Sequence, residues 1–340
     1  MRVFNKDKLR LLITDACNLS CTYCHNEGQF GRNNFMSVES VRNLAEWLKT
    51  NDVTIGSLII SGGEPSIHPQ LLEIVDCLRG CSRSLSMVTN GTRLTTTKID
   101  ALRAAGMKYI KFGIDAVTEA TTKGPLLRNS QAAHRAVLDT ALYAADTMPG
   151  SHLNTVVSSF NWDDVPSLIE WCDKNRIGVK FLELIEVRPE IQAINPLSAP
   201  RNHAWFGELY SRCNELVFDA TYNPSVMKFY ARTLSGQTVQ FSENFCRYGA
   251  CSQLWTRIDS LSRLIPCIHS PETRALSHSP IGVGQVAQVN LEMTETNKWP
   301  CGIPPSRIEP LHVAAQRPAI VTMPDGSQQE FSLTTRTGCI

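Results

Sequence analysis

The alternation of short β-type runs with amphipathic helical stretches constrains the fold of this chain more than any other feature. Between Leu9 and about Val187, such runs alternate with segments whose apolar residues recur at helical spacing, which is typical of βα units that build a parallel sheet. The expected strands are Leu9–Thr14, Leu58–Ser61, Ser84–Thr89, Tyr109–Ile114, Leu153–Ser158 and Val179–Ile185. The expected helices are Ser37–Lys49, Leu71–Leu78, Lys98–Ala105, Ala132–Ala145 and Val165–Lys174.

Six βα units are fewer than the eight of a closed barrel, so the predicted fold is α/β, with a partial (β/α)6 TIM-like barrel. Its chemistry should lie at the C-terminal ends of the strands. Three prolines between Arg188 and Pro200 interrupt the rhythm and indicate a boundary. We therefore expect residues 1–190 to form the barrel, and residues 191–340 to form an irregular, cysteine-dotted C-terminal region.

A group of three cysteines directly follows the first expected strand. Cys17, Cys21 and Cys24 form a Cys-x3-Cys-x2-Cys loop. Three thiolates can bind three irons of a cubane [4Fe–4S] cluster and leave the fourth iron open, as a catalytic cluster requires. A zinc site that lacks one ligand and three unrelated core cysteines are the alternative interpretations.

A glycine-rich motif ends the second expected strand. Gly62 and Gly63 allow the backbone to approach a ligand closely, and the Glu64 carboxylate can accept hydrogen bonds from an amino group. Taken with the cysteine loop one βα unit earlier, the motif resembles that of the radical S-adenosylmethionine (SAM) superfamily. The resemblance implies that a [4Fe–4S] cluster on the loop binds SAM and reductively cleaves it to a 5′-deoxyadenosyl radical, which abstracts hydrogen from a substrate.

Further SAM contacts follow from the same resemblance, one position at a time. Thr89 at the end of the third strand resembles a SAM donor, and Gly113 and Asp115 after the fourth resemble positions near the ribose and the carboxylate. Asn154 on the fifth strand resembles a position near the adenosyl group, and Tyr23 is expected close to the adenine. Ordinary turns and caps at strand ends are the alternative explanation of these residues.

A second cysteine group lies beyond the expected boundary and comprises Cys246, Cys251 and Cys267. Over the whole chain, the resemblance is to the GTP 3′,8-cyclase (molybdenum cofactor biosynthesis protein A) family. That family carries an auxiliary [4Fe–4S] cluster here, in a twitch-like C-terminal region. Both intervals between these cysteines are longer than the family's Cys-x2-Cys-x13-Cys, so zinc or isolated thiols stay open, with Cys213 and Cys301 as alternative ligands.

The anion contacts of that family are largely replaced in this chain. Arg10 matches a family arginine on the first strand and is the candidate substrate contact. The five other contacts correspond to Ser57, Ile59, His152, Gln253 and Trp255. Cys339 stands near the end of the chain, where the family has Gly-Gly, and is a candidate hydrogen donor or iron ligand unless the terminus is frayed. We therefore expect a substrate other than GTP.

Composition limits the partners and the compartment. The 33 Lys and Arg residues balance 32 Asp and Glu, so nucleic acid is not expected as a partner. Neither a signal region nor a run of about 18 apolar residues is found, so we expect a cytoplasmic protein that does not enter membranes. Twelve cysteines in such a protein should be reduced thiols, and Cys77, Cys81 and Cys172 are expected to pack in the core.

The sequence favours a radical SAM enzyme that acts on a small molecule, such as a nucleoside- or sugar-like compound, by hydrogen abstraction that leads to cyclisation, epimerisation or oxidation. The chemistry implies a flavodoxin- or ferredoxin-type reductant. Modification of a ribosomally made peptide, by crosslinking or epimerisation, and GTP 3′,8-cyclisation are the alternatives. An electron-transfer protein is disfavoured because such a carrier needs no SAM pocket. The first strand begins near residue 9, leaving little room before it for a peptide-recognition domain, which favours small molecules.

Overall fold

The computed structural model describes residues 8–29, 33–117, 131–185, 212–213, 215–223, 228–242, 256–265, 274–275, 319–322 and 328–331. The chain divides into two compact units that interleave along the sequence. The first contains Met1–Gly113, Lys123–His152 and Cys251–Pro305, and the second contains Ile114–Thr122, Leu153–Ala250 and Ser306–Ile340. The expected boundary at residues 190 and 191 lies outside the described residues and stays a prediction.

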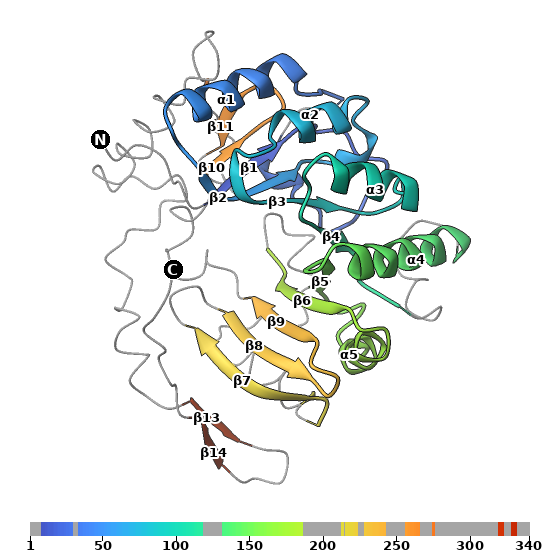
Figure 1. Ribbon diagram of the computed structural model, residues 1–340. Coiled ribbons are helices and arrows are strands. Elements are labelled where there is room, and N and C mark those ends of the chain that lie inside the picture. Colours follow the sequence, from blue (N-terminus) through green and yellow to red (C-terminus); the bar gives the residue numbers. More distant parts are fainter. Residues whose placement is uncertain are drawn as a thin grey trace. The chain divides into compact units, whose positions relative to one another are not determined.

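The first unit is built on a mainly parallel sheet. Its N-terminal strands are β1 (Lys8–Leu12), β2 (Ile55–Ser61), β3 (Ser82–Thr89) and β4 (Tyr109–Gly113), each parallel to the next. Its helices are α1 (Val38–Thr50), α2 (Leu71–Cys77), α3 (Thr96–Ala104) and α4 (Gln131–Thr147), with short 3-10 turns η1 (Asn26–Gly28) and η2 (Pro65–Ile67). Helices α1, α2 and α3 lie along one side of the sheet (Figure 1).

The core of this unit follows from the alternation of side chains along each strand. One face of the sheet consists of apolar side chains that are fully buried, among them Leu9, Leu11, Leu58, Ile60, Ile110 and Phe112. Helix α1 buries Val41, Leu44 and Leu48 along one stripe and begins at Ser37, whose side chain accepts a hydrogen bond from Ser40 N. Burial of these matching faces holds the helices against the sheet.

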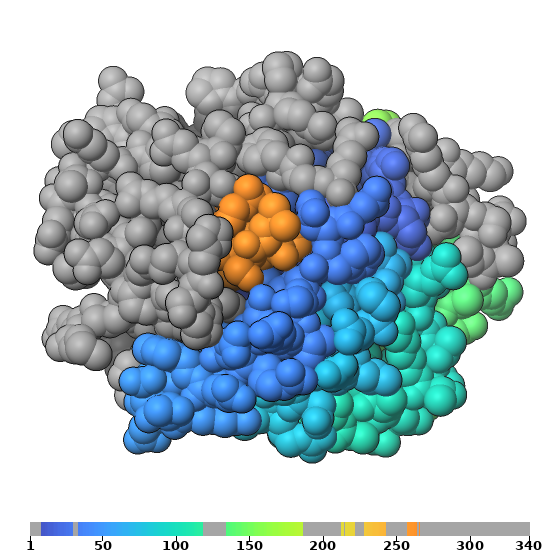
Figure 2. Space-filling view, turned by 90° about the horizontal axis from the view of Figure 1, so that it is seen from above, coloured from blue at the N-terminus to red at the C-terminus, as the bar shows by residue number. Residues whose placement is uncertain are grey.

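Three short C-terminal strands extend this sheet beyond β1. They are β10 (Thr256–Ile258), β11 (Arg263–Ile265) and β12 (Arg274–Ala275), which give the order β12-β11-β10-β1-β2-β3-β4. Strand β10 runs parallel to β1, whereas β10 and β11 form an antiparallel hairpin. Figure 2 shows this hairpin in orange on the surface, directly beside N-terminal residues in blue.

The second unit contains β5 (His152–Val157), α5 (Val165–Lys174), β6 (Gly178–Glu183), β7 (Val217–Asn223), β8 (Lys228–Thr233) and β9 (Thr238–Ser242). Its strand order is β5-β6-β9-β8-β7, in which β6 and β9 are parallel and β7, β8 and β9 are antiparallel neighbours. Phe181 of β6 stacks on Phe241 of β9, with ring centroids 5.2 Å apart. Strands β13 (Ala319–Thr322) and β14 (Gln328–Phe331) pair with each other.

The six strands and five helices that the sequence predicts are all present, with ends that differ by a few residues. The predicted α/β class, with a parallel sheet that does not close into a full barrel, is confirmed. The expectation of irregular structure after Pro200 is wrong for the described residues, which contain β7 to β14. Most of them are antiparallel neighbours in sequence, β7 with β8, β8 with β9 and β10 with β11, so the alternation of strand and helix that marked the first six strands does not mark these. No helix among the described residues is long and apolar enough to cross a membrane.

Candidate active site

The cysteine loop follows β1 directly, at the C-terminal edge of the sheet. The side chains of Cys17 and Cys24 are exposed and that of Cys21 is half-buried, and all three are reduced thiols. Backbone N–H groups donate to the sulfurs, from Leu19 to Cys17 Sγ and from Asn26 to Cys24 Sγ, each at 3.4 Å. A turn closed by Cys24 N donating to Cys21 O (3.1 Å) completes the loop.

The donor chemistry of this loop fits an iron–sulfur cluster. N–H···S bonds of this kind stabilise the thiolate form that binds iron, and exposed sulfurs are accessible to a cluster. Partial burial raises the pKa of Cys17, and the nearby charges of Glu64 and Cys24 also raise it. The backbone hydrogen bond from Leu19 acts in the opposite direction and lowers the pKa. Among the described residues no three His, Cys, Asp or Glu side chains, these three thiols included, are already grouped around one point, so it is the donor chemistry of the loop and not a preformed cage that fits the cluster.

The two glycines hold the end of β2 against the backbone of the cysteine loop. Gly63 N donates to Thr14 O and Glu64 N donates to Ala16 O, both at 2.8 Å. A Cβ atom on Gly62 would lie 2.2 Å from Thr14 O, and one on Gly63 would lie 2.1 Å from Ala16 O. Since real Cβ atoms essentially never come within 3.0 Å of such atoms, only glycine permits this approach.

Glu64 is a buried carboxylate, only 1% exposed, at the centre of this edge. Its Oε1 accepts from Ser66 N (2.8 Å) and Thr89 Oγ1 (2.6 Å), and its Oε2 accepts from Asn90 N (2.6 Å). Burial raises the pKa of Glu64 although these hydrogen bonds act to lower it. Burial lowers the pKa of the nearby Lys98, although the negative charge of Glu64 acts to raise it.

Asn90 connects the end of β3 to the cysteine loop and is a site residue that the sequence reasoning missed. Its Nδ2 lies 3.9 Å from Cys17 Sγ and donates to Asn18 Oδ1 at 3.0 Å. Asn18 Nδ2 in turn donates to Thr92 Oγ1 at 2.8 Å. The Asn-Gly pair after β3 pointed to a turn, and only the fold brings its side chain to a thiol 73 residues away.

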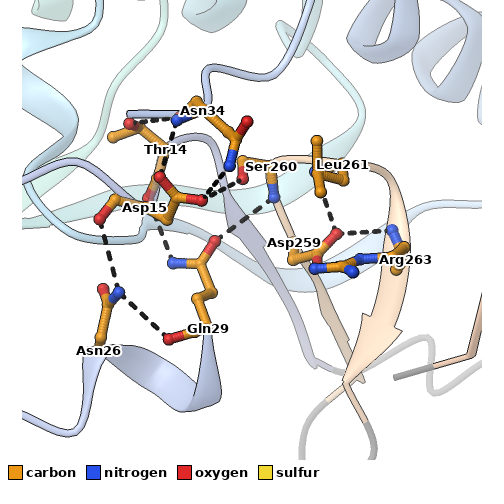
Figure 3. A network of polar contacts seen from close by, with 9 residues as sticks. All are labelled: Thr14, Asp15, Asn26, Gln29, Asn34, Asp259, Ser260, Leu261 and Arg263. Carbon is orange, nitrogen blue, oxygen red and sulfur yellow. Dashed lines mark hydrogen bonds and ion pairs between the residues drawn. The ribbon is translucent and has the colours of Figure 1, made fainter. Parts of the chain in front are cut away.

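A polar network joins the cysteine loop to the β10–β11 hairpin (Figure 3). Asp15 accepts from Asn34 N (2.8 Å) and Asn34 Nδ2 (2.6 Å), and its Oδ2 also accepts from Ser260 Oγ (3.5 Å). Gln29 donates to Thr14 O (3.2 Å) and accepts from Ser260 N (3.4 Å). The hairpin therefore supports the loop from the side of β1 that is opposite β2.

Arg10, the candidate substrate contact, forms an ion pair with Glu27, which follows Cys24 in the loop. Arg257 Nε of β10 lies 3.5 Å from the other carboxylate oxygen of Glu27, and Ser61 Oγ donates to Glu27 at 3.3 Å. Burial alone would raise the pKa of Glu27, but Arg10, with His25, Arg257 and Ser61, lowers it to about 2.

Arg257 is a second cation beside Arg10 that the sequence did not indicate. The expected positions of two replaced anion contacts, Gln253 and Trp255, lie outside the described residues. The parallel pairing of Arg10 with Arg257 confirms that a second cation stands on this part of the sheet.

The predicted SAM contacts are divided between the two units. Thr89 and Gly113 belong to the first, where Thr89 bonds Glu64 and a Cβ on Gly113 would meet Thr89 O at an ordinary 3.6 Å. Tyr23 is half-buried in the cysteine loop. In the second unit, Asp115 Oδ1 accepts from Val156 N (2.8 Å), and the buried Oδ1 of Asn154 has no hydrogen-bond partner among the described residues.

Several predicted site residues lie outside the described residues: Cys246, Cys251, Cys267, Cys301 and Cys339. Cys213, considered as an alternative ligand, is buried, which raises the pKa of its thiol to about 12. Cys81 and Cys172 are buried as expected of core residues, whereas Cys77 is only half-buried.

The chain combines a parallel α/β sheet with three cysteines after the first strand and a glycine-walled edge that holds a buried carboxylate. These features define a class of proteins that bind a cofactor at the strand ends. Residues 11–172 match the family model described as "Radical SAM superfamily", and the chain therefore contains a radical SAM domain. This domain implies a [4Fe–4S] cluster and bound SAM, and indicates an enzyme.

Curated relatives share the name GTP 3′,8-cyclase. GTP 3′,8-cyclase 1 of Mycobacterium tuberculosis (strain CDC 1551 / Oshkosh) is 31% identical over 189 residues, which cover 53% of this chain and 51% of that protein. The GTP 3′,8-cyclase of Chlorobaculum tepidum is 26% identical over 296 residues, which cover 84% of this chain and 85% of that protein. The chain thus spans only about half the length of the first of these relatives.

Solved structures share the fold at low sequence identity. Native anSMEcpe with bound AdoMet superposes with a TM-score of 0.53 at 15% identity, covering 84% of this chain and 80% of that chain. Streptococcus suis SuiB superposes with a TM-score of 0.55 at 13% identity, covering 77% of this chain and 60% of that chain. At these identities the likeness concerns the fold alone.

Proposed function

We propose that this chain is a radical SAM enzyme that abstracts hydrogen from a small molecule, such as a nucleoside- or sugar-like compound, and so leads to its cyclisation, epimerisation or oxidation. The observation that carries the proposal is the backbone pairing of Gly63 and Glu64 with Thr14 and Ala16. This pairing joins the cysteine loop to the glycine motif in one rigid edge. The cysteine loop, which would hold the cluster, and the glycine motif, which would hold SAM, are then fixed next to each other.

The roles of the residues follow from their chemistry. Cys17, Cys21 and Cys24 would hold the [4Fe–4S] cluster, which together with SAM supplies a carbon radical. Glu64 offers a buried negative charge to the amino group of SAM. Thr89 orients that carboxylate, since its hydroxyl donates to Oε1 at 2.6 Å.

Four further residues complete the proposed SAM site. Gly113, Asp115, Asn154 and Tyr23 would contact the ribose, the carboxylate and the adenosyl group. The buried Asn154 Oδ1, which accepts no hydrogen bond from the part of the chain that the structure describes, suits a ligand hydroxyl or amino group.

An auxiliary [4Fe–4S] cluster on Cys246, Cys251 and Cys267 is part of the proposal. In the sequence, Cys251 precedes β10 and Cys267 follows β11. Because β10 and β11 are antiparallel, the chain segments that flank them leave from the same end of the hairpin. A flavodoxin- or ferredoxin-type protein is the proposed electron donor.

GTP 3′,8-cyclisation is the second candidate, favoured by the name that the curated relatives carry. Against it stand Ser57 and Ile59, which are described and replace cations of that family. Peptide modification is a further alternative, since one structure similar in fold is SuiB bound to its precursor peptide.

The proposal is tested with the full chain, reconstituted anaerobically with iron and sulfide. With SAM and dithionite it should release 5′-deoxyadenosine, and Cys24→Ala should abolish both this release and the EPR signal of the reduced cluster. Cys77→Ala, which changes a half-buried thiol on α2, is the matched control and should retain both. Absence of 5′-deoxyadenosine under all conditions, including added cell extract, would refute the enzyme assignment, and a cyclised GTP product would identify the second candidate.

A further inference from the structure

The strand register places two arginines side by side on the sheet face away from the fully buried apolar residues. Arg10 of β1 is the Cα partner of Arg257 of β10, and paired residues of parallel neighbours point to the same side. The same register row continues through Ile59, Ser86 and Tyr109. Two adjacent guanidinium groups are a common means of binding phosphate or carboxylate.

In this chain a carboxylate of the protein itself already lies between them. Glu27 contacts both arginines, one with each carboxylate oxygen, and Ser61 adds a hydrogen bond. The side chains are largely buried, with exposed fractions of 11% for Glu27, 19% for Arg10 and 14% for Arg257. The backbone of Glu27 has φ 54°, in the left-handed region, within the short turn η1 that follows the cysteine loop.

We propose that Glu27 is a specificity-determining residue, an internal counter-ion that occupies the Arg10–Arg257 pair and excludes polyanionic substrates from this part of the face. One carboxylate against two guanidinium groups leaves one positive charge instead of two, and its two oxygens already occupy the position between the arginines that a phosphate would take. The substrate therefore carries no polyanionic group at the part that lies over β1 and β10. This inference rests on the proposed function, with Arg10 as the candidate substrate contact.

The inference is tested by calorimetric titration of the cluster-reconstituted full chain with inorganic triphosphate. Glu27→Gln retains the shape of the side chain but removes its charge, so triphosphate should bind at least tenfold more tightly than to the wild type. Adding Arg257→Gln to that variant should reverse the gain. Glu73→Gln, which breaks the exposed Arg42–Glu73 pair, is the control and should leave the affinity unchanged. Equal affinity of the wild type and Glu27→Gln would overturn the inference.

A second variant keeps the inference testable if Glu27→Gln does not fold. In a chain that retains Glu27, Arg257→Gln should leave triphosphate affinity at the wild-type level. If the wild type binds triphosphate tightly and Arg257→Gln loses this binding, the Arg10–Arg257 pair is open to anions and the inference fails. Release of 5′-deoxyadenosine from SAM is measured on the same samples. It reports on the proposed function alone, so the two failures are distinguishable.

Discussion

Two buried carboxylates, Glu64 and Glu27, lie at the same end of the sheet of the first unit, in opposite electrostatic settings. The three hydrogen-bond donors of Glu64 among the described residues are neutral, two backbone N–H groups and one hydroxyl, and burial raises its pKa. Glu27 lies between two arginines, and its pKa falls to about 2. The difference shows that Glu64 still gains from an incoming cation, whereas Glu27 is already neutralised.

The largest expected effect comes from breaking the edge that holds Glu64. In Gly63→Ala the new Cβ would lie 2.1 Å from Ala16 O, so the loop and the end of β2 must separate. A displacement of about 1 Å can cost roughly 100-fold in rate, so release of 5′-deoxyadenosine should fall by at least about 100-fold. Chromatographic measurement of 5′-deoxyadenosine checks this.

The control for that substitution is Gly80→Ala. Gly80 has φ 77° but open space around its Cβ position, so the cost is conformational only, about 1 kcal/mol. It should leave the release of 5′-deoxyadenosine near the wild-type level. Equal activity of Gly63→Ala and the wild type would show that the close approach is not needed.

Removing the charge of Glu64 tests whether a cation binds there. In Glu64→Gln an amide N–H₂ replaces one acceptor oxygen, and the charge-assisted bond to an amino group, about 1.5–3 kcal/mol, is lost. The affinity for SAM should fall by roughly 10- to 100-fold in equilibrium binding. Glu46→Gln, an exposed position on α1, should bind SAM as the wild type does; unchanged affinity of Glu64→Gln would contradict the assignment.

The stability that Glu27 contributes should depend on pH. Its folded pKa of about 2 lies below the ordinary 4.5, so its contribution is present above pH 4.5 and is lost as pH falls toward 2. Glu27→Gln should therefore lower the free energy of unfolding by about 3 kcal/mol at pH 7, with a difference that shrinks below pH 4.5. Urea denaturation followed by circular dichroism measures both; a pH-independent difference would mean that packing, not charge, explains the loss.

The smallest expected effect concerns Asn90, next to the Glu64 edge. Asn90→Ala removes the 3.9 Å contact from Nδ2 to Cys17 Sγ but keeps the backbone bond to Glu64. A weak hydrogen bond of about 0.5 kcal/mol corresponds to about 20 mV for a one-electron couple. The midpoint potential of the cluster should become more negative by this amount in EPR-monitored titration. A potential equal to that of the exposed control Asn51→Ala would exclude such a role.

Much of the first unit could be predicted because its information is local. The period of 3.6 residues in α1 and the runs of β1 to β4 are visible in short windows, and the cysteine and glycine motifs stand directly at strand ends. Strand β10 could not be predicted in this way, because three residues carry no periodicity and its partner β1 lies far away in the sequence.

The sequence by itself determined the order of the βα units, the cysteine loop and the glycine motif, because each depends on neighbouring residues. Only the tertiary structure decided the partners of the charged residues. Arg10 read alone indicated a substrate contact, and Glu27 carried no signal. Their pairing, with Arg257 added from β10, depends on strand register, which is set by burial of one face of the whole sheet and not by any segment alone.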